Sequence, residues 1–454
     1  MTLLYFDGFD QYVDIPTPTL VAPCSTVRGL SNQAVVANDL PINTSINSLA
    51  SYCKLYGEER VWRIPAPNIG NSSLGSHQYQ QNRQNVPYAR SDSPYALTLD
   101  ARQTVAQQTK LVIGYKMKHA DNQYRYFSSN QYNLPLAVFS TSSAFSTQYS
   151  TWAVVLGYLN VISIKPMLSS TTYGWTFNEL GQTWQPGTFA TGQNPILGTC
   201  NFVYGACQAS RTSTSPCIPP IEQLAANTVE IELTDAGKVS VWINNQFIGS
   251  CQFSDGYKGY VTSAQYIKVG LLPSYFVNGS GTTDFNVFSG ITDTYMLNGL
   301  GTTNNKRLGK VKVLSRRPVT DSAVQFIRPD TANTNAEVAA TVPPLFSNSL
   351  TGAKVGDTDL YASNAFKFTN EAIIAASIVT TGYKTDPSGN DIAPVIKVGG
   401  TTYPGNTNIV PISASLMKTE QSIYELNPKT NLPFTKSDLD ASTFGVTVVA
   451  PVVV

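Results

Sequence analysis

The strongest constraint on the fold is a pair of alternating segments joined by a tight turn. Residues 228–233 (TVEIEL) and 238–243 (KVSVWI) alternate polar and apolar side chains, and Thr-Asp-Ala-Gly lies between them. A period of two puts the apolar side chains on one face of a strand, and a short connection that contains glycine is typical of a hairpin. Asn244 and Asn245 provide the next turn. We therefore expect an antiparallel sheet with one buried face.

The same alternation recurs along the chain, whereas long stretches with helical periodicity are almost absent. The best helix candidates are short, at residues 45–56 and 220–226. Because each sheet must bury its apolar face, the pattern predicts an all-β protein whose antiparallel sheets close into a sandwich. The further predicted strands are residues 111–118, 152–164, 266–271, 365–368, 373–380 and 392–398.

The composition agrees with strands joined by polar turns. Charged residues make up 13% of the 454 residues, against about 25% in an ordinary soluble domain. Aromatic residues reach 11% and the net charge is +1, which excludes a disordered chain and leaves no field to attract nucleic acid. No apolar run is long enough for a bilayer, and the first residues lack the basic leader of a signal peptide. We expect no nucleic-acid partner and no membrane insertion.

A change in composition divides the chain near residue 318. The 5 tryptophans and 6 cysteines all precede it, and a stretch rich in Thr, Asn, Ala and Pro follows. We predict a larger β-sandwich domain over residues 1–318 and a smaller β domain over residues 319–454, which starts with an extended connection (319–344). The apolar segment 444–454 would aggregate if exposed, so it should pair with its own domain or with another subunit.

The cysteines match no zinc-site spacing. Their even number allows disulfides, and Cys200, Cys207 and Cys217 share one irregular loop where a local bridge is conceivable. For a chain that folds in a reducing cytosol, we expect buried free thiols instead.

Four segments carry a resemblance to a known family. They are residues 3–12 (LLYFDGFDQY), 228–250 (the hairpin followed by NNQFIGS), 291–313 (ITDTYMLNGLGTTNNKRLGKVKV) and 423–448 (IYELNPKTNLPFTKSDLDASTFGVTV). The third combines a strand, a polar loop, a glycine stop at Gly309 and a second alternating strand. Together the four resemble virion structural proteins of tailed bacteriophages that contain a concanavalin-like β-sandwich.

The resemblance implies both a fold and a role. The fold is a concanavalin-like antiparallel β-sandwich (jelly roll) followed by a smaller β-sandwich-like domain. The role is a non-enzymatic virion component, assembled in the host bacterial cytoplasm with other virion proteins and with copies of itself. A tail-associated appendage, such as a tail fibre, baseplate or collar element, is the place we expect. The alternatives are a capsid decoration protein and a protein that binds a host-surface glycan or receptor.

We find no motif for catalysis, for a cofactor or for a metal. Glu230 and Glu232 share one strand face, but their spacing differs from the glycosidase order E-x-D-x-x-E, so we interpret them as a solvated sheet face. Asp386, Asn390 and Asp391 lack an EF-hand pattern and suit an Asx turn better than a calcium site. We therefore predict that the protein is not an enzyme.

One aromatic group is a candidate binding surface. Tyr173, Trp175 and Phe177 alternate along a predicted strand, and Trp184 follows. Such rings can form a flat platform that stacks on sugars, whereas burial in a core is the commoner use of large aromatics. A host-surface glycan is the ligand that these four residues would take.

Overall fold

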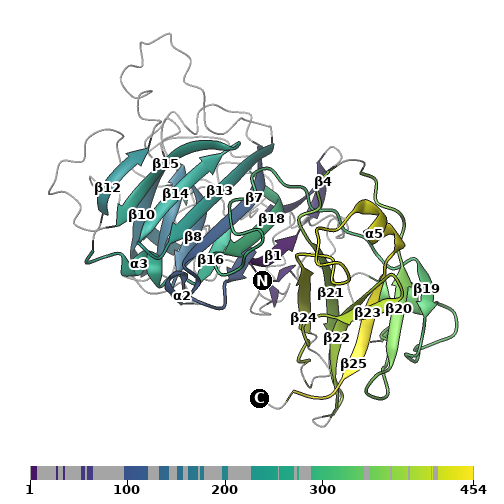
Figure 1. Cartoon of the computed structure of the whole chain (residues 1–454). Helices are drawn as coiled ribbons and strands as arrows, with labels where there is room; N and C mark the ends of the chain where they lie inside the picture. Colours follow the sequence, from purple (N-terminus) through teal and green to yellow (C-terminus); the bar gives the residue numbers. More distant parts are fainter. Residues whose placement is uncertain are drawn as a thin grey trace, which may run out of the picture.

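The computed structural model confirms the all-β fold class: nearly all of its elements are antiparallel strands (Figure 1). Among the described residues, no helix has the length and apolarity needed to cross a bilayer. The model describes residues 2–7, 27–28, 34–35, 53–56, 59–64, 97–120, 132–142, 151–156, 162–171, 174–177, 197–202, 226–253, 255–269, 274–275, 288–341, 347–368, 371–386, 389–410, 412 and 418–452.

The larger sheet contains the predicted hairpin. Its strand order is β12-β15-β14-β13-β7-β18-β5-β4, and β1 also pairs with β18. Asn244 and Asn245 both have positive φ, 52° and 68°, as a two-residue hairpin turn requires. The strands are β1 (Leu3–Asp7), β4 (Cys53–Tyr56), β5 (Glu59–Ile64), β7 (Lys110–Ala120), β12 (Leu197–Phe202), β13 (Ala226–Thr234), β14 (Lys238–Ile243), β15 (Gln246–Phe253) and β18 (Phe288–Asn298).

A second sheet packs against the first to form the sandwich. The Tyr115 hydroxyl on β7 donates to the carbonyl of Leu136 at 2.6 Å, and Trp152 stacks on Phe139 at 4.5 Å between ring centroids. Trp152 also lies 5.5 Å from Phe253 of the first sheet, so aromatic rings join the two layers. The strands are β6 (Leu97–Asp100), β8 (Tyr132–Ser140), β9 (Thr151–Leu156), β10 (Ile162–Thr171), β11 (Gly174–Phe177), β16 (Tyr266–Val269) and β17 (Ser274–Tyr275).

The remaining elements before residue 300 are small. A two-stranded pair joins β2 (Val27–Arg28) to β3 (Ala34–Val35), and the short helices are α2 (Val105–Gln108) and α3 (Gly259–Thr262). Residues 53–56, predicted as the end of a helix, form strand β4 because they pair with β5. Residues 45–52 and 220–225 lie outside the described residues. The predicted strand 152–164 is two strands, β9 and β10, which pair with each other.

After residue 318 the chain forms two further sheets. A five-stranded sheet has the order β19-β20-β25-β22-β23, and β21 pairs with β24. The segment 319–344, predicted to be extended, contains strand β19 and helix α4, and residues 365–368 are not a strand. The elements are β19 (Thr320–Ala323), α4 (Asn335–Ala339), β20 (Thr358–Ala362), β21 (Ala376–Gly382), β22 (Asp391–Val398), β23 (Thr401–Pro404), β24 (Lys418–Tyr424), α5 (Lys436–Ala441) and β25 (Thr443–Val449).

The apolar C-terminal segment pairs within its own chain. Strand β25 lies in the centre of the five-stranded sheet, between β20 and β22. Its backbone hydrogen bonds are therefore used on both sides, which removes the aggregation hazard of a free apolar edge.

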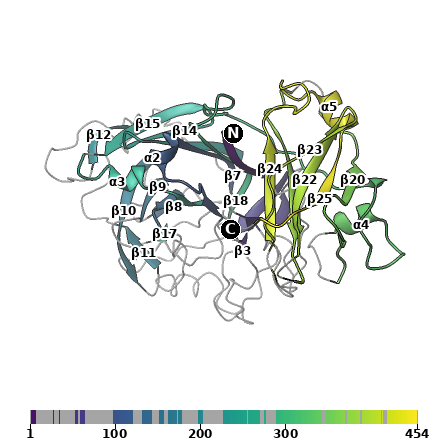
Figure 2. The same ribbon diagram turned by 60° about the horizontal axis from the view of Figure 1, so that its bottom comes forward.

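The two groups of sheets lie side by side, with β1 and β24 at their junction (Figures 1 and 2). Leu3, Tyr295 and Leu297 from the first group form one apolar cluster with Ile423 of β24. A shared core of this kind couples the two parts energetically.

Candidate functional site

A row of side chains crosses the outer face of the larger sheet. Tyr295, Gly114, Glu230, Trp242 and Phe247 are successive register partners on β18, β7, β13, β14 and β15. Neighbouring strand residues point to opposite faces. Since Tyr115 points into the sandwich, this row lies on the face that points away from it.

Glu230 is fully buried in this row, so the interpretation of a solvated carboxylate at this position is wrong. Its Oε1 accepts hydrogen bonds from the Tyr295 hydroxyl and, at 2.7 Å, from the backbone N–H of Gly309. Its Oε2 forms an ion pair with Arg307. Glu232, the other carboxylate, is partly exposed. Because both oxygens of Glu230 bind groups of the protein itself, we assign the carboxylate a structural role.

Residues 299–313, which we call the strap, cover Glu230. A second alternating strand was predicted within the strap, yet no residue of it belongs to a sheet. The backbone N–H groups of Leu308 and Val313 instead donate to the Tyr295 hydroxyl at 3.1 Å and to Asp293 Oδ1 at 2.9 Å. Side chains of the sheet thus satisfy the strap backbone, so the strap lies over the face of the sheet and forms no new edge strand.

Two glycines make this arrangement possible. A Cβ at Gly114 would lie 2.0 Å from Cε1 of Tyr295. Because glycine has no side chain, the Tyr295 ring can cross β7 at this position and reach Glu230. Gly309 has a φ of +71°, which glycine adopts without strain. Burial, together with the charge of Glu230, raises the pKa of Tyr295, and its hydroxyl therefore stays a donor.

Arg307 connects the buried Glu230 carboxylate to the surface. Besides Glu230, its Nη1 donates to Asn245 Oδ1 at 2.8 Å. Its guanidinium carbon lies 4.8 Å from the centroid of the Trp242 ring. Trp242 in turn contacts Phe247, with 5.3 Å between centroids. Arg307 of the strap thus contacts both the Glu230 carboxylate and the Trp242 ring.

Side chains of β24 and the residue after it cap the outer edge of β1. Glu425 Oε1 accepts the backbone N–H groups of Thr2 and Leu3 at 2.8 and 2.6 Å. The Gln421 side chain accepts from the Phe6 N–H at 3.3 Å and donates to the Phe6 carbonyl at 2.7 Å. These contacts, together with the apolar cluster around Ile423, make up what we call the seam.

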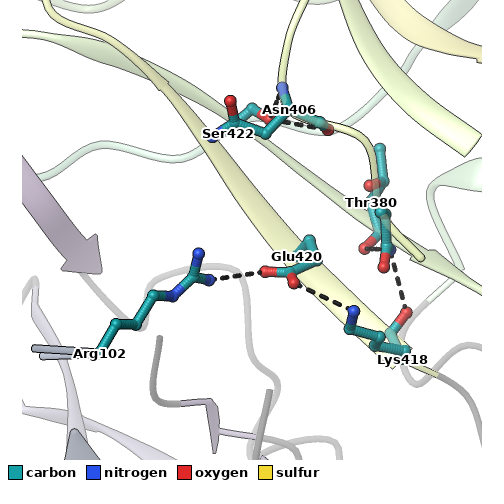
Figure 3. A network of polar contacts seen from close by, with 7 residues as sticks. Arg102, Thr380, Asn406, Lys418, Glu420 and Ser422 are labelled. Atoms are coloured by element: carbon teal, nitrogen blue, oxygen red, sulfur yellow. Dashed lines mark hydrogen bonds and ion pairs between the residues drawn. The ribbon is translucent and has the colours of Figure 1, made fainter. Parts of the chain in front are cut away.

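A polar network extends the seam. Figure 3 shows Arg102, which follows β6, pointing toward Glu420 of β24, and the two form an ion pair at 3.3 Å. Lys418 holds the other oxygen of Glu420 at 3.3 Å. Glu420 thus joins one cation from each part of the chain.

The predicted aromatic platform is described only in part. Trp175 and Phe177 lie on β11, where their backbones pair with Ser170 and Met167 of β10. Their side chains, and all of Tyr173 and Trp184, lie outside the described residues. The glycan hypothesis for these four residues therefore stays a prediction.

Asp391 is buried and paired with a cation. Lys384 Nζ lies 2.7 Å from its Oδ1, and the N–H groups of Val410 and Val452 donate to its two oxygens. Burial opposes ionisation, but the hydrogen bonds from Lys384 and the two backbone groups outweigh it and lower the pKa of Asp391. A carboxylate that already binds an ammonium group suits a structural role, and the described residues contain no group of three or more potential metal ligands.

Cys251 corrects the expectation of free thiols, because it is disulfide-bonded. It lies on β15, and Cys200 is its register partner on β12. Cys24, Cys207 and Cys217 lie outside the described residues.

Comparison with known proteins leaves the family open. No family model and no curated protein matches the chain. Among solved structures, the receptor-binding domain of botulinum neurotoxin type G is 12% identical with a TM-score of 0.21, over 42% of this chain and 34% of that chain. An alginate lyase from Pseudomonas aeruginosa is 11% identical with a TM-score of 0.21, over 43% and 68%. The binding domain of a botulinum neurotoxin of serotype D/C is 10% identical with a TM-score of 0.22, over 77% and 68%. At such scores these likenesses assign no function.

Proposed function

We propose that this chain is a structural component of a tailed bacteriophage virion, in a tail-associated appendage such as a fibre, baseplate or collar element. It acts by assembly with other virion proteins and with copies of itself. A capsid decoration protein is the nearest alternative, since it differs in position and not in chemistry.

The observation that carries the proposal is the meeting of the four resembling segments. Segment 3–12 pairs through β1 with β18, which opens segment 291–313. Arg307 of segment 291–313 binds Glu230 of the hairpin segment. Glu425 of segment 423–448 caps the start of β1. The segments that carry the resemblance are distant in sequence but contact one another in the fold.

Charge supports the same role. At this junction Glu230 pairs with Arg307, and Glu420 pairs with Arg102 and Lys418. The surface of a chain with only 13% charged residues suits wide polar contacts between subunits.

Mass spectrometry of purified phage particles tests the proposal. We expect the chain in intact virions in a fixed multiple of a known tail protein, and immunogold labelling should place it on the tail. Labelling over the whole capsid would identify a decoration protein instead. Absence from washed, infectious particles would overturn the proposal.

A further inference from the structure

We propose that Phe247, Trp242 and Arg307 form a binding site for a neutral sugar. This site goes beyond the assembly role and is distinct from the aromatic residues on β11. One observation carries this proposal. Two aromatic rings and a guanidinium group lie together where the row of side chains that contains Glu230 reaches the surface.

Of the two rings in the site, Phe247 is exposed and Trp242 is partly exposed. Phe247 is 46% exposed, although it directly opposes Trp242 in the β14–β15 ladder. The planes of the two rings meet at 52°, so they form an angled apolar surface. A bulge between Val241 and Trp242 shifts the register there, and bulges commonly re-aim side chains near functional sites. A single exposed ring needs no explanation, but two rings beside a planar cation make a surface that fits the C–H face of a sugar ring.

The polar part is held in place before any ligand arrives. Glu230 and Asn245 fix Nη1 of Arg307, and within the described part of the chain its Nε and Nη2 hydrogens have no acceptor. Asn245 uses its Oδ1 on Arg307, and its amide hydrogens, which have no acceptor among the residues that the structure describes, can donate to a ligand. The Asn244 side chain accepts from Thr228 N–H at 3.0 Å and donates to Asn227 at 2.8 Å, and so fixes the turn. Preorganised donors lower the entropy cost of binding hydroxyl groups.

Charge selects the class of sugar. The charge of Arg307 is balanced by Glu230, which is fully buried beneath it. An acidic sugar would bring a second negative charge to a guanidinium group that this carboxylate already neutralises. The geometry therefore favours neutral hexose or pentose units over uronic or sialic acids.

A glycan array probed with the full-length chain tests the proposal. The array carries neutral oligosaccharides and matched uronate- and sialate-containing ones, and calorimetry then measures the affinity for the best neutral oligosaccharide. We expect neutral glycans to bind, and Phe247→Ala to weaken binding by about tenfold, equivalent to about 1.4 kcal/mol. Leu300→Ala is the matched control, because this apolar side chain is 53% exposed on the same part of the chain; its affinity should equal that of the unchanged protein.

Several outcomes would overturn the site. They are the absence of neutral-glycan binding at millimolar concentration, stronger binding of acidic glycans, and unchanged affinity in Phe247→Ala. Loss of binding in Trp175→Ala together with full binding in Phe247→Ala would place the sugar on β11 instead. Particle composition measures the proposed assembly role separately, so either proposal can fail without the other.

Discussion

At the scale of single residues, Glu230 organises the outer face of the larger sheet. A buried carboxylate is tolerated only when its charge is paired and its oxygens are hydrogen-bonded. Here Arg307 provides the charge, while Tyr295 and the backbone of Gly309 provide the other donors. The stability of this face therefore depends on the residues that bind the Glu230 carboxylate.

Gly114→Ala should destabilise the protein by about 1–3 kcal/mol, the usual cost of overpacking. The added methyl group would collide with the Tyr295 ring and push its hydroxyl away from Glu230. Urea unfolding measures the loss. Gly256→Ala is the control, since a Cβ there meets nothing within 4 Å. Equal stability of the two variants would contradict the close packing of the Tyr295 ring on Gly114.

Arg307→Ala should cost about 3–5 kcal/mol in the free energy of unfolding, because it leaves a buried charge unpaired. Adding Glu230→Gln to that variant should recover part of the loss, since an amide oxygen still accepts from Gly309 without carrying a charge. The same urea titrations test both variants. If the double variant is less stable than Arg307→Ala alone, the ion pair is not the source of the cost.

At the scale of elements, the short helices of the C-terminal part rely on their caps. Helix α5 starts with a capping box: Thr435 Oγ1 accepts from the N–H of Asp438, and the Asp438 carboxylate accepts from the backbone N–H and hydroxyl of Thr435. The hydrogen bond from the Thr435 backbone, followed by that from its hydroxyl, lowers the pKa of Asp438. A helix of 6 residues is too short to be stable by propensity alone.

Thr435→Ala should lower the free energy of unfolding by about 1 kcal/mol at neutral pH, whereas Thr435→Ser should keep it. Because the folded-state pKa of Asp438 lies below its unfolded value, its contribution is complete above the unfolded pKa and is lost as the pH falls through the folded pKa. The difference between Thr435→Ala and the unchanged protein should therefore shrink in acid. Unfolding titrations from neutral pH to about pH 3 measure this, and a constant difference would contradict it.

At the scale of the whole molecule, the seam makes the two parts of the chain behave as one. Glu425 and Gln421 replace the missing ladder partner of β1, and Ile423 joins the apolar cluster behind it. An edge strand that is covered in this way cannot pair with another chain.

The double variant Gln421→Ala and Glu425→Ala should uncouple the two parts. Losing the bonds to the backbone of β1 should cost about 2–4 kcal/mol, and calorimetry should then resolve two unfolding transitions. Leu432→Ala, at a side chain that is 62% exposed on the same part, is the control and should leave the thermogram unchanged. One unshifted transition in the double variant would mean that the seam does not couple the parts.

The fold class, the hairpin and most strands follow from the amino-acid sequence alone, because period-two alternation and turn residues act locally. The sequence also contained one overlooked signal: Gly114 inside a strand is typical of a close approach by another group. The sequence could not determine that the strap leaves the sheet, because its backbone donors find acceptors on Tyr295, Glu230 and Asp293. Nor could it show that Glu230 is buried or that Phe247 is exposed. The burial of Glu230, the exposure of Phe247 and the course of the strap depend on tertiary contacts. Contacts of this kind join residues up to 423 positions apart among the described residues.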